Sequence, residues 1–312
     1  MNYEDFKKTV EKELKNYLPE ELKKMHCEVK SIDKINRTVD AIAFTPIDKK
    51  EANVSPVIYI NDMYDYYNSC NDLDLVLQEF AQLLKEGMSK ADCCYVSEMK
   101  LENFKNNVVF QFINTEQNKE LLSKVPHREI LDLSIIYRWV VDINENNIQS
   151  TIVKNPLIES LNLNEQQLFN LAVDNTKRLF TPSVKNLNKV IRDMLIKQNA
   201  PSEVIDELTN LPITIEQTIW VISNDRGVNG AINIMYEDVL HDLSNKLNSN
   251  LYIIPSSVHE CIAVSANDYE PEHLISVVPE VNATEVLPEE ILSDRVYYYD
   301  RKTKKITFVK TK

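Results

Sequence analysis

Two of the three glycines in this 312-residue chain lie within nine positions, SNDRGVNGA, from Ser223 to Ala231. The segment joins a predicted strand to a predicted helix that starts at about Ala231. The free N–H groups in the first turn of such a helix, at the positive end of its dipole, can bind an anion. Arg226 could add a bidentate donor for phosphate or carboxylate. The candidate ligand contacts are therefore Asn224, Asp225, Arg226, Gly227 and Gly230.

The same glycines also have a purely structural explanation. Glycine tolerates positive φ and close backbone approach, and Asn229 or Asp225 could simply cap the helix. The segment matches neither G-x-x-x-x-G-K-[ST] nor G-x-G-x-x-G, the two phosphate-binding glycine patterns. We therefore favour a tight strand-to-helix turn over a ligand loop.

A second candidate is PSSVHEC, from Pro255 to Cys261, which places serines, His259, Glu260 and a thiol close together. Such residues can form a catalytic nucleophile with its base. However, His259 and Glu260 would point to opposite faces of a strand over 258–265. The G-x-S-x-G elbow and the H-E-x-x-H zinc pattern are both missing. A turn in which Ser256 or Ser257 bonds the backbone is the favoured interpretation.

Two further places could contact a ligand. In VPHREILD, the pair His127 and Arg128 could recognise an anion, although charged clusters of this kind are usually surface salt bridges. Asn175 falls in the apolar stripe of a predicted helix, and a buried amide must find hydrogen-bond partners. We expect a neighbouring strand end to supply them.

Hydrophobic periodicity predicts the elements that carry these residues. A capping box at Asn164 and Gln167 starts one helix, Thr181 and Pro182 are expected to start the next, and Gly87 is expected to end another. The predicted helices span 3–18, 72–86, 118–125, 164–180, 181–197, 201–208, 231–247 and 270–278. In the first of them, Phe6, Val10, Leu14 and Leu18 form an apolar stripe at a spacing of four. The predicted strands span 27–46 (two strands around a turn at 34–37), 55–60, 107–114, 130–143, 148–154, 218–223, 251–254, 259–265 and 296–309 (a hairpin).

Strands and helices are mixed without a regular β-α-β rhythm, which favours an α+β fold with mostly antiparallel sheets packed against helices. The expected domains are a small α-β-β-β-α unit over 1–95 and a larger α+β unit over 96–312. The larger unit is expected to contain a helical insertion near 183–212.

The composition is that of a soluble globular protein, with 43% hydrophobic and 27% charged residues. No apolar run is long enough to cross a membrane, and the N-terminal segment lacks the pattern of a secretory signal. A cytoplasmic location is therefore expected.

The five cysteines, with Cys93 and Cys94 adjacent, do not suggest a disulfide framework. The absence of paired ligands at short spacing argues against a metal site, and no cofactor is expected.

The net charge of −13 is unevenly spread. From Leu247 to Asp294 there is no lysine or arginine but nine carboxylates, whereas the tail RKTKKITFVKTK is basic. An acidic region of this kind argues against direct nucleic-acid binding, because phosphates must be neutralised by cations. It could receive a basic protein partner.

Three segments, VPHREILDLSIIYRWVVDI, TIEQTIWVISNDRGVNGAINIMYEDVL and NLYIIPSSVHECI, resemble a family of uncharacterised Firmicutes proteins common in gut clostridia. That family is classed as a domain of unknown function. The resemblance covers most of the chain and implies a cytoplasmic bacterial protein. It supplies no catalytic residues, and Gly227 is an extra glycine relative to the family pattern.

The leading hypothesis is a non-enzymatic binding or adaptor protein that recognises a protein partner or a small anionic ligand. Tyrosines in MYDYYNS and VYYYD could serve an interface, or they could equally be strand residues packed on one side. One alternative is a hydrolase or phosphoryl-handling enzyme that uses the 224–231 loop with His259 and Glu260, and it requires Arg226 and His259 to face one pocket. A second alternative is an acidic inhibitor that mimics nucleic acid, which apolar segments such as HLISVVPEV disfavour.

Overall fold

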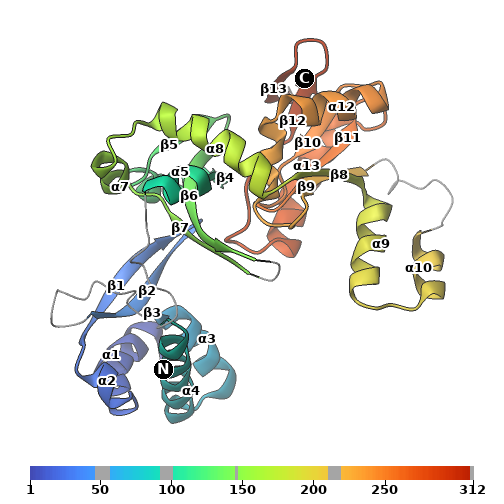
Figure 1. Cartoon of the computed structure of the whole chain (residues 1–312). Helices are drawn as coiled ribbons and strands as arrows, with labels where there is room; N and C mark the ends of the chain where they lie inside the picture. The colour runs from blue at the N-terminus through green and yellow to red at the C-terminus, as the bar shows by residue number, and fades with distance from the viewer. Residues whose placement is uncertain (46–56, 92–100, 145–146, 210–218, 310–312) are drawn as a thin grey trace. The chain divides into compact units, whose positions relative to one another are not determined.

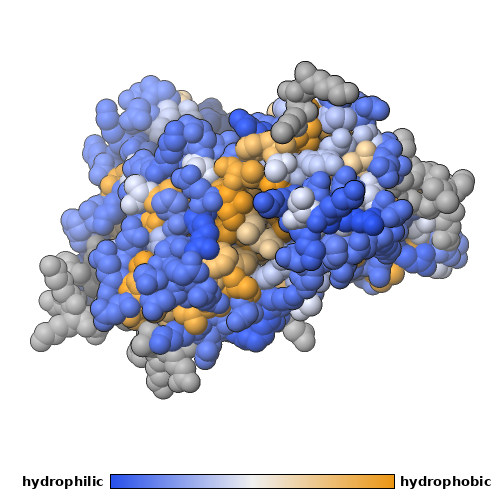
Figure 2. Space-filling model, turned by 90° about the horizontal axis from the view of Figure 1, so that it is seen from above, coloured by the Kyte–Doolittle hydropathy of each residue, from blue (hydrophilic) through white to orange (hydrophobic). Residues whose placement is uncertain are grey.

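The computed structural model describes residues 1–45, 57–91, 101–144, 147–209 and 219–309. In this part the chain has the predicted α+β fold, with three mostly antiparallel sheets and packed helices (Figure 1). It divides into two compact units, residues 1–100 and 101–312, which are described separately below. None of the described helices combines the length and apolarity needed to cross a bilayer. On the face seen in Figure 2 the surface is largely hydrophilic, with several apolar patches among the polar residues.

Unit 1 has a helical layer packed on a three-stranded sheet. The predicted stripe of Phe6, Val10, Leu14 and Leu18 is buried in its core, and Asn36 adopts the left-handed conformation (φ 59°) in the predicted turn. Strand β2 is central, with β1 and β3 paired on either side. The elements are α1 (Tyr3–Glu13), η1 (Leu14–Asn16), α2 (Glu20–Lys23), β1 (His26–Lys34), β2 (Arg37–Thr45), β3 (Val57–Tyr59), α3 (Ile60–Cys70) and α4 (Leu73–Ala91).

One expectation for unit 1 was wrong. Helix α4 continues past Gly87 to Ala91, so this glycine does not end it. The segment MYDYYNS forms α3, where the rings of Tyr64 and Tyr67 each lie 5.2 Å from the ring of Phe6. These two tyrosines therefore belong to the packing between helices rather than to a free interface.

Unit 2 contains two sheets, and the first is built around the long strand β6. Strand β4 pairs along one side of β6, and β5 and β7 pair along the other. The separate strand β5 was not predicted, and Leu131 (φ 58°) makes the tight turn between β5 and β6. The elements are α5 (Leu101–Asn107), β4 (Val108–Asn114), η3 (Glu116–Asn118), α6 (Lys119–Leu122), β5 (His127–Ile130), β6 (Leu133–Ile143), β7 (Ile148–Ile152), α7 (Asn155–Ser160) and α8 (Glu165–Leu179).

The second sheet of unit 2, called the C-terminal sheet here, has the order β13-β12-β10-β11-β9-β8. Side chains on one face of this sheet pack with those of β4 and α8 in one hydrophobic core, which includes Phe110, Ala172 and Ile222. Leu274 and Val278 cover the opposite face from α13. The elements are β8 (Pro182–Asn186), α9 (Leu187–Lys197), α10 (Ser202–Thr209), β9 (Ile219–Asn224), η4 (Gly230–Met235), α12 (Glu237–Leu247), β10 (Leu251–Ile254), β11 (Cys261–Ser265), α13 (Pro271–Glu285), β12 (Tyr297–Asp300) and β13 (Lys305–Phe308).

A polar cluster joins the two sheets of unit 2. The carboxylate of Asp132, beside the β5–β6 turn, accepts hydrogen bonds from the hydroxyls of Ser293 and Tyr297, each at 2.6 Å. Burial, together with the neighbouring Asp132 charge, raises the pKa of Tyr297 well above its ordinary value. The tyrosines of VYYYD are strand residues, and Tyr297 and Tyr299 are buried.

Two helix predictions in unit 2 need correction. Pro182 begins the edge strand β8, and the following helix starts at Leu187 with Asn186 as its cap. Proline suits an edge strand because its missing N–H leaves no ladder bond unmade there. The predicted helix over 231–247 is interrupted at Tyr236, whose backbone is extended. This break lets the Tyr236 hydroxyl donate to the carbonyl of Val173 on α8.

Candidate functional site

A groove of about 500 Å³ lies where the edge of the C-terminal sheet meets α9. Its floor comes from β8 and β9, whose register pairs Ser183 with Ser223 and Lys185 with Val221, so that all four share one face. Its wall is one side of α9, and its end is the loop that follows β9. The remaining lining residues are Val190, Asp193, Met194, Lys197, Asn224, Asp225, Arg226, Gly227 and Glu260.

The groove carries charges of both signs. Lys185 Nζ lies 2.6 Å from Asp193 Oδ2, and this hydrogen bond holds the pKa of the Asp193 carboxyl below its ordinary value. Arg226 Nη1 donates to the carbonyl of Asn144 at 2.8 Å, a neutral partner, and no carboxylate among the described residues forms an ion pair with its guanidinium. Glu260 accepts a hydrogen bond from Ser257 Oγ at 2.9 Å. The groove thus offers both cationic donors and carboxylate acceptors to a ligand.

Asn224 holds the loop that presents Arg226. Its Oδ1 accepts from the N–H groups of Arg226 (3.0 Å) and Val228 (3.3 Å), and its Nδ2 donates to the carbonyl of Val228 at 2.7 Å. Gly227 completes the turn at φ 66°, a conformation that is unstrained for glycine. The side chain of Asn224 is therefore used within the loop.

Gly230 is needed for a different reason. A Cβ atom there would lie 2.4 Å from Ser223 Oγ and 2.6 Å from the carbonyl oxygen of His259. Glycine permits the loop after β9 to touch the segment before β11. The two glycines thus serve a left-handed turn and a close contact, as the structural interpretation of the sequence requires.

The candidate anion site at the start of a helix near Ala231, the less favoured of the two interpretations, is not formed by these backbone groups. The N–H of Ala231 donates to the carbonyl of Val258, and the N–H of Asn229 donates to Nδ1 of His259, both at 3.3 Å. The helix that starts here, η4, is a short 3-10 helix rather than an α-helix. These N–H groups are already bonded within the protein, so the groove depends on side chains instead.

His259 lies beside the loop but does not line the groove. Because its Nδ1 accepts from Asn229, its Nε2 carries the proton and donates to Glu290 Oε1 at 3.1 Å. Ser257 Oγ accepts from the N–H of His259, which fits the predicted turn. The structure therefore brings Arg226 and Glu260 to one groove but leaves out His259, which the enzyme hypothesis requires.

The thiol of Cys261 is unsuited to nucleophilic chemistry. It is buried, its sulfur lies 3.6 Å from the carbonyl oxygen of Ala231, and burial raises its pKa. Cys27, Cys70 and Cys261 are free thiols, whereas Cys93 and Cys94 fall outside the described residues. Among the residues that the structure describes, no His, Cys, Asp and Glu side chains gather in a group that could hold a metal ion.

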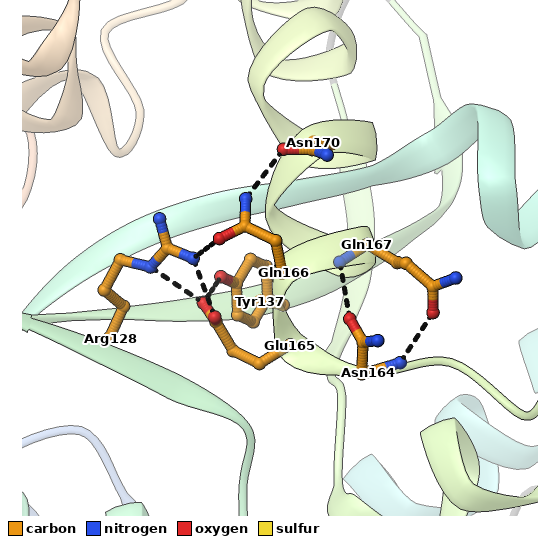
Figure 3. A network of polar contacts seen from close by, with 7 residues as sticks. All are labelled: Arg128, Tyr137, Asn164, Glu165, Gln166, Gln167 and Asn170. Carbon is orange, nitrogen blue, oxygen red and sulfur yellow. Dashed lines mark hydrogen bonds and ion pairs between the residues drawn. The ribbon is translucent and has the colours of Figure 1, made fainter.

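Arg128 belongs to a packed network at the start of α8 (Figure 3). Its guanidinium donates to both carboxylate oxygens of Glu165, at 3.1 and 2.8 Å, and lies 3.9 Å over the ring of Phe169. Tyr137 donates to the same carboxylate, and its pKa is raised mainly by burial. His127 Nδ1 lies 3.1 Å from the carbonyl oxygen of Val125. The network anchors α8 to the sheet, and Arg128 is engaged in it.

Asn175 also has a structural role. Its side-chain amide donates to the carbonyls of Lys105 (2.8 Å) and Val108 (3.0 Å), where α5 leads into β4. These are the strand-end partners expected from the sequence. The predicted capping box at Asn164 is present as well, with both of its hydrogen bonds made (Figure 3).

A second cavity, of about 430 Å³, was not foreseen from the sequence. It lies between α12 and the opposite face of β8 and β9. The ammonium of Lys246 sits 4.2 Å over the Trp220 ring, and Lys177 pairs with Asp238 at 2.6 Å. The helical spacing of apolar and charged residues on α12 could have indicated the wall that this helix forms. The wall formed by β8 could not be found, because the sequence predicts a helix over 181–197 there. The remaining lining residues are Thr181, Pro182, Val184, Val239, Asp242 and Leu243.

Residues 3–301 match the model of a protein family described as a family of unknown function, DUF5688. The chain belongs to this family. No curated protein and no solved structure shows significant similarity to the chain. The family match covers both units and attaches no activity to the groove.

Proposed function

We propose that unit 2 is a binding module whose ligand is a small polar molecule with an anionic group. The observation that carries this proposal is the position of Arg226, which lines the groove and has a neutral carbonyl as its hydrogen-bond partner. A guanidinium placed in this way is suited to a carboxylate or phosphate of the ligand.

The other side chains of the groove support the same class of ligand. Lys197 adds a second positive charge from α9, close enough to Asp193 to contribute to its lowered pKa. Asp225 and Glu260 offer acceptors for hydroxyl or amino groups of the same molecule. Val190 and Val221 provide apolar surface between the charged ends. A phosphorylated metabolite or a small amino or hydroxy acid has this chemistry.

The test is a thermal-unfolding screen of the wild type with inorganic phosphate, nucleotides, sugar phosphates, amino acids and hydroxy acids. A ligand at a hundred times its Kd stabilises the protein by about 2.7 kcal/mol, which raises Tm by roughly 2 °C or more. We expect Arg226→Ala and Lys197→Ala to reduce this shift. Lys189→Ala, on the same helix but outside the groove, is the matched control and should keep it.

Two results would count against the proposal. The first is a wild-type Tm that no compound raises, and the second is a shift that survives unchanged in Arg226→Ala. Isothermal titration of the best compound then gives its Kd and stoichiometry, which should be one site per chain.

A further inference from the structure

Strand β8 is the outermost described strand of the C-terminal sheet, and a cavity flanks it on each face. Side chains alternate between the two faces of a strand. Ser183 and Lys185 line the groove, whereas Pro182 and Val184 line the second cavity beside Trp220. An edge strand with a cavity on either side is the arrangement that accepts the alternating side chains of an added strand.

The register shows which backbone groups of β8 face outward. The N–H of Asp225 donates to the carbonyl of Thr181 at 2.9 Å, and in an antiparallel pair every second residue bonds to the same neighbour. Ser183 and Lys185 therefore bond to β9, while the N–H and C=O of Val184 point away from it. The same alternation continues across the sheet, where the N–H of Ala266 donates to the carbonyl of Asn250.

We propose that β8 binds an extended segment of a partner protein, which adds to the C-terminal sheet as a further strand. Val184 would supply the central N–H and C=O for this pairing. The paired segment must be short, because Pro182 has no N–H and Asn186 is already the cap of α9. Successive side chains of the segment would enter the two cavities in turn.

The linings of the cavities define the sequence of the segment. Val184, Trp220, Val239 and Leu243 give the second cavity apolar walls, so the side chains on that face are apolar. On the groove face, Lys185 is paired with Asp193, whereas Arg226 forms no ion pair within the described residues, so the side chain beside Arg226 is acidic, and this part of the inference rests on the proposed function. The partner therefore presents a short stretch of alternating apolar and acidic residues.

The probe is a fluorescein-labelled heptapeptide of alternating valine and glutamate, with blocked ends, measured by fluorescence anisotropy. The matched control alternates valine and lysine and should bind at least about tenfold more weakly. Two further glutamate peptides carry backbone N-methyl groups, one on the valines and the other on the glutamates. We expect one of them to bind within about threefold of the parent and the other about tenfold or more weakly. Equal binding of the two methylated peptides, or no binding at about 1 mM, would overturn the inference.

Variants of Val184 test the same contact from the protein side. Val184→Pro removes the outward N–H without removing a bond to β9, and it should weaken the peptide about tenfold. Val184→Thr keeps that N–H and should stay within about threefold of wild type. Circular dichroism confirms folding, and if Val184→Pro is unfolded the methylated peptides on wild-type protein decide the question.

Two readouts separate this inference from the other possibilities. Val184→Pro should keep the Tm shift caused by small anions, whereas Arg226→Ala should lose it, so failure of one proposal is distinguishable from failure of the other. Light scattering coupled to gel filtration reports the mass of the wild type. A dimer that Val184→Pro abolishes would make a second copy of this chain the occupant and would overturn the assignment to a partner protein.

Discussion

The backbone N–H of Asn229 donates a hydrogen bond to Nδ1 of His259 at 3.3 Å. The other ring nitrogen donates to Glu290, and the backbone N–H of Val258 donates to the carbonyl of the same glutamate at 2.9 Å. His259 therefore ties together the loop after β9, the segment before β11 and the chain beyond α13. A histidine in this position organises the end of the groove without entering it.

Replacing His259 with alanine should loosen that junction. The N–H of Asn229 loses its acceptor and Glu290 loses its donor, which should cost about 1–2 kcal/mol of unfolding free energy. Hydrogen exchange should quicken at the amides of residues 226–231. His273→Ala, an exposed histidine on α13, is the control and should change neither quantity. Unchanged exchange in His259→Ala would mean that the backbone contacts alone hold the junction.

The two loop glycines should respond differently to alanine. In Gly230→Ala the new Cβ would overlap Ser223 Oγ and two backbone atoms, so the variant should lose about 1–3 kcal/mol of stability. Gly227→Ala meets no atom within 4 Å but must adopt positive φ, which costs about 1 kcal/mol. Urea denaturation of both variants measures the difference. Equal losses, or a larger loss at Gly227, would contradict the packing role of Gly230.

Asn175→Ala should destabilise unit 2 by about 1–3 kcal/mol, because it leaves the carbonyls of Lys105 and Val108 without their donor. Asn170→Ala, at an exposed position of the same helix, should cost less than about 0.5 kcal/mol. Chemical denaturation compares the two variants directly. A ligand role for Asn175 would instead appear as normal stability with a changed Tm shift in the ligand screen.

Unit 1 should show a defined loss of stability in acid. Asp40 accepts hydrogen bonds from Lys7 (2.6 Å), Ser31 and Tyr3, and the Lys7 bond is the main cause of its lowered pKa. A carboxyl whose pKa is lowered in the folded state stabilises the fold above its unfolded pKa of about 4, and this contribution disappears as the pH falls through the folded pKa.

The matching variant is Asp40→Asn, which should be less stable than wild type by about 1 kcal/mol at pH 7. The difference should vanish near pH 2. Glu79→Gln, an exposed carboxyl on α4, should show no difference at either pH. Denaturation curves at the two pH values provide the measurement, and a gap that persists in acid would rule out the Asp40 carboxylate as its source.

Where a local pattern determines the structure, the sequence was sufficient. The capping box at Asn164, the apolar stripe of α1 and the hairpin of β12 and β13 all formed as predicted, because neighbouring residues alone specify caps, stripes and tight turns. The helix prediction at Pro182 was wrong for the opposite reason. Its Thr-Pro start is typical of a helix, but pairing with β9, distant in the sequence, makes it a strand.

The same distinction applies to the groove. Arg226 and Glu260 lie together because β11, which Glu260 precedes, pairs with β9, whereas the next strand along the chain, β10, does not. The role of α9 as the wall could not be predicted, because it depends on β8 lying at the edge of the sheet. The orientation of His259 depends on Asn229 and Glu290, and no local signal relates those residues.

The contacts of Asp132 with Ser293 and Tyr297 also constrain how unit 2 is made during protein synthesis. Asp132 is synthesised 161 positions before Ser293 and 165 positions before Tyr297, the residues that complete its polar cluster. Strand β12, which pairs with β10 in the C-terminal sheet, emerges later than any other strand of that sheet except β13. The Asp132 carboxylate and one side of β10 therefore gain their partners only when the last part of unit 2 has been synthesised.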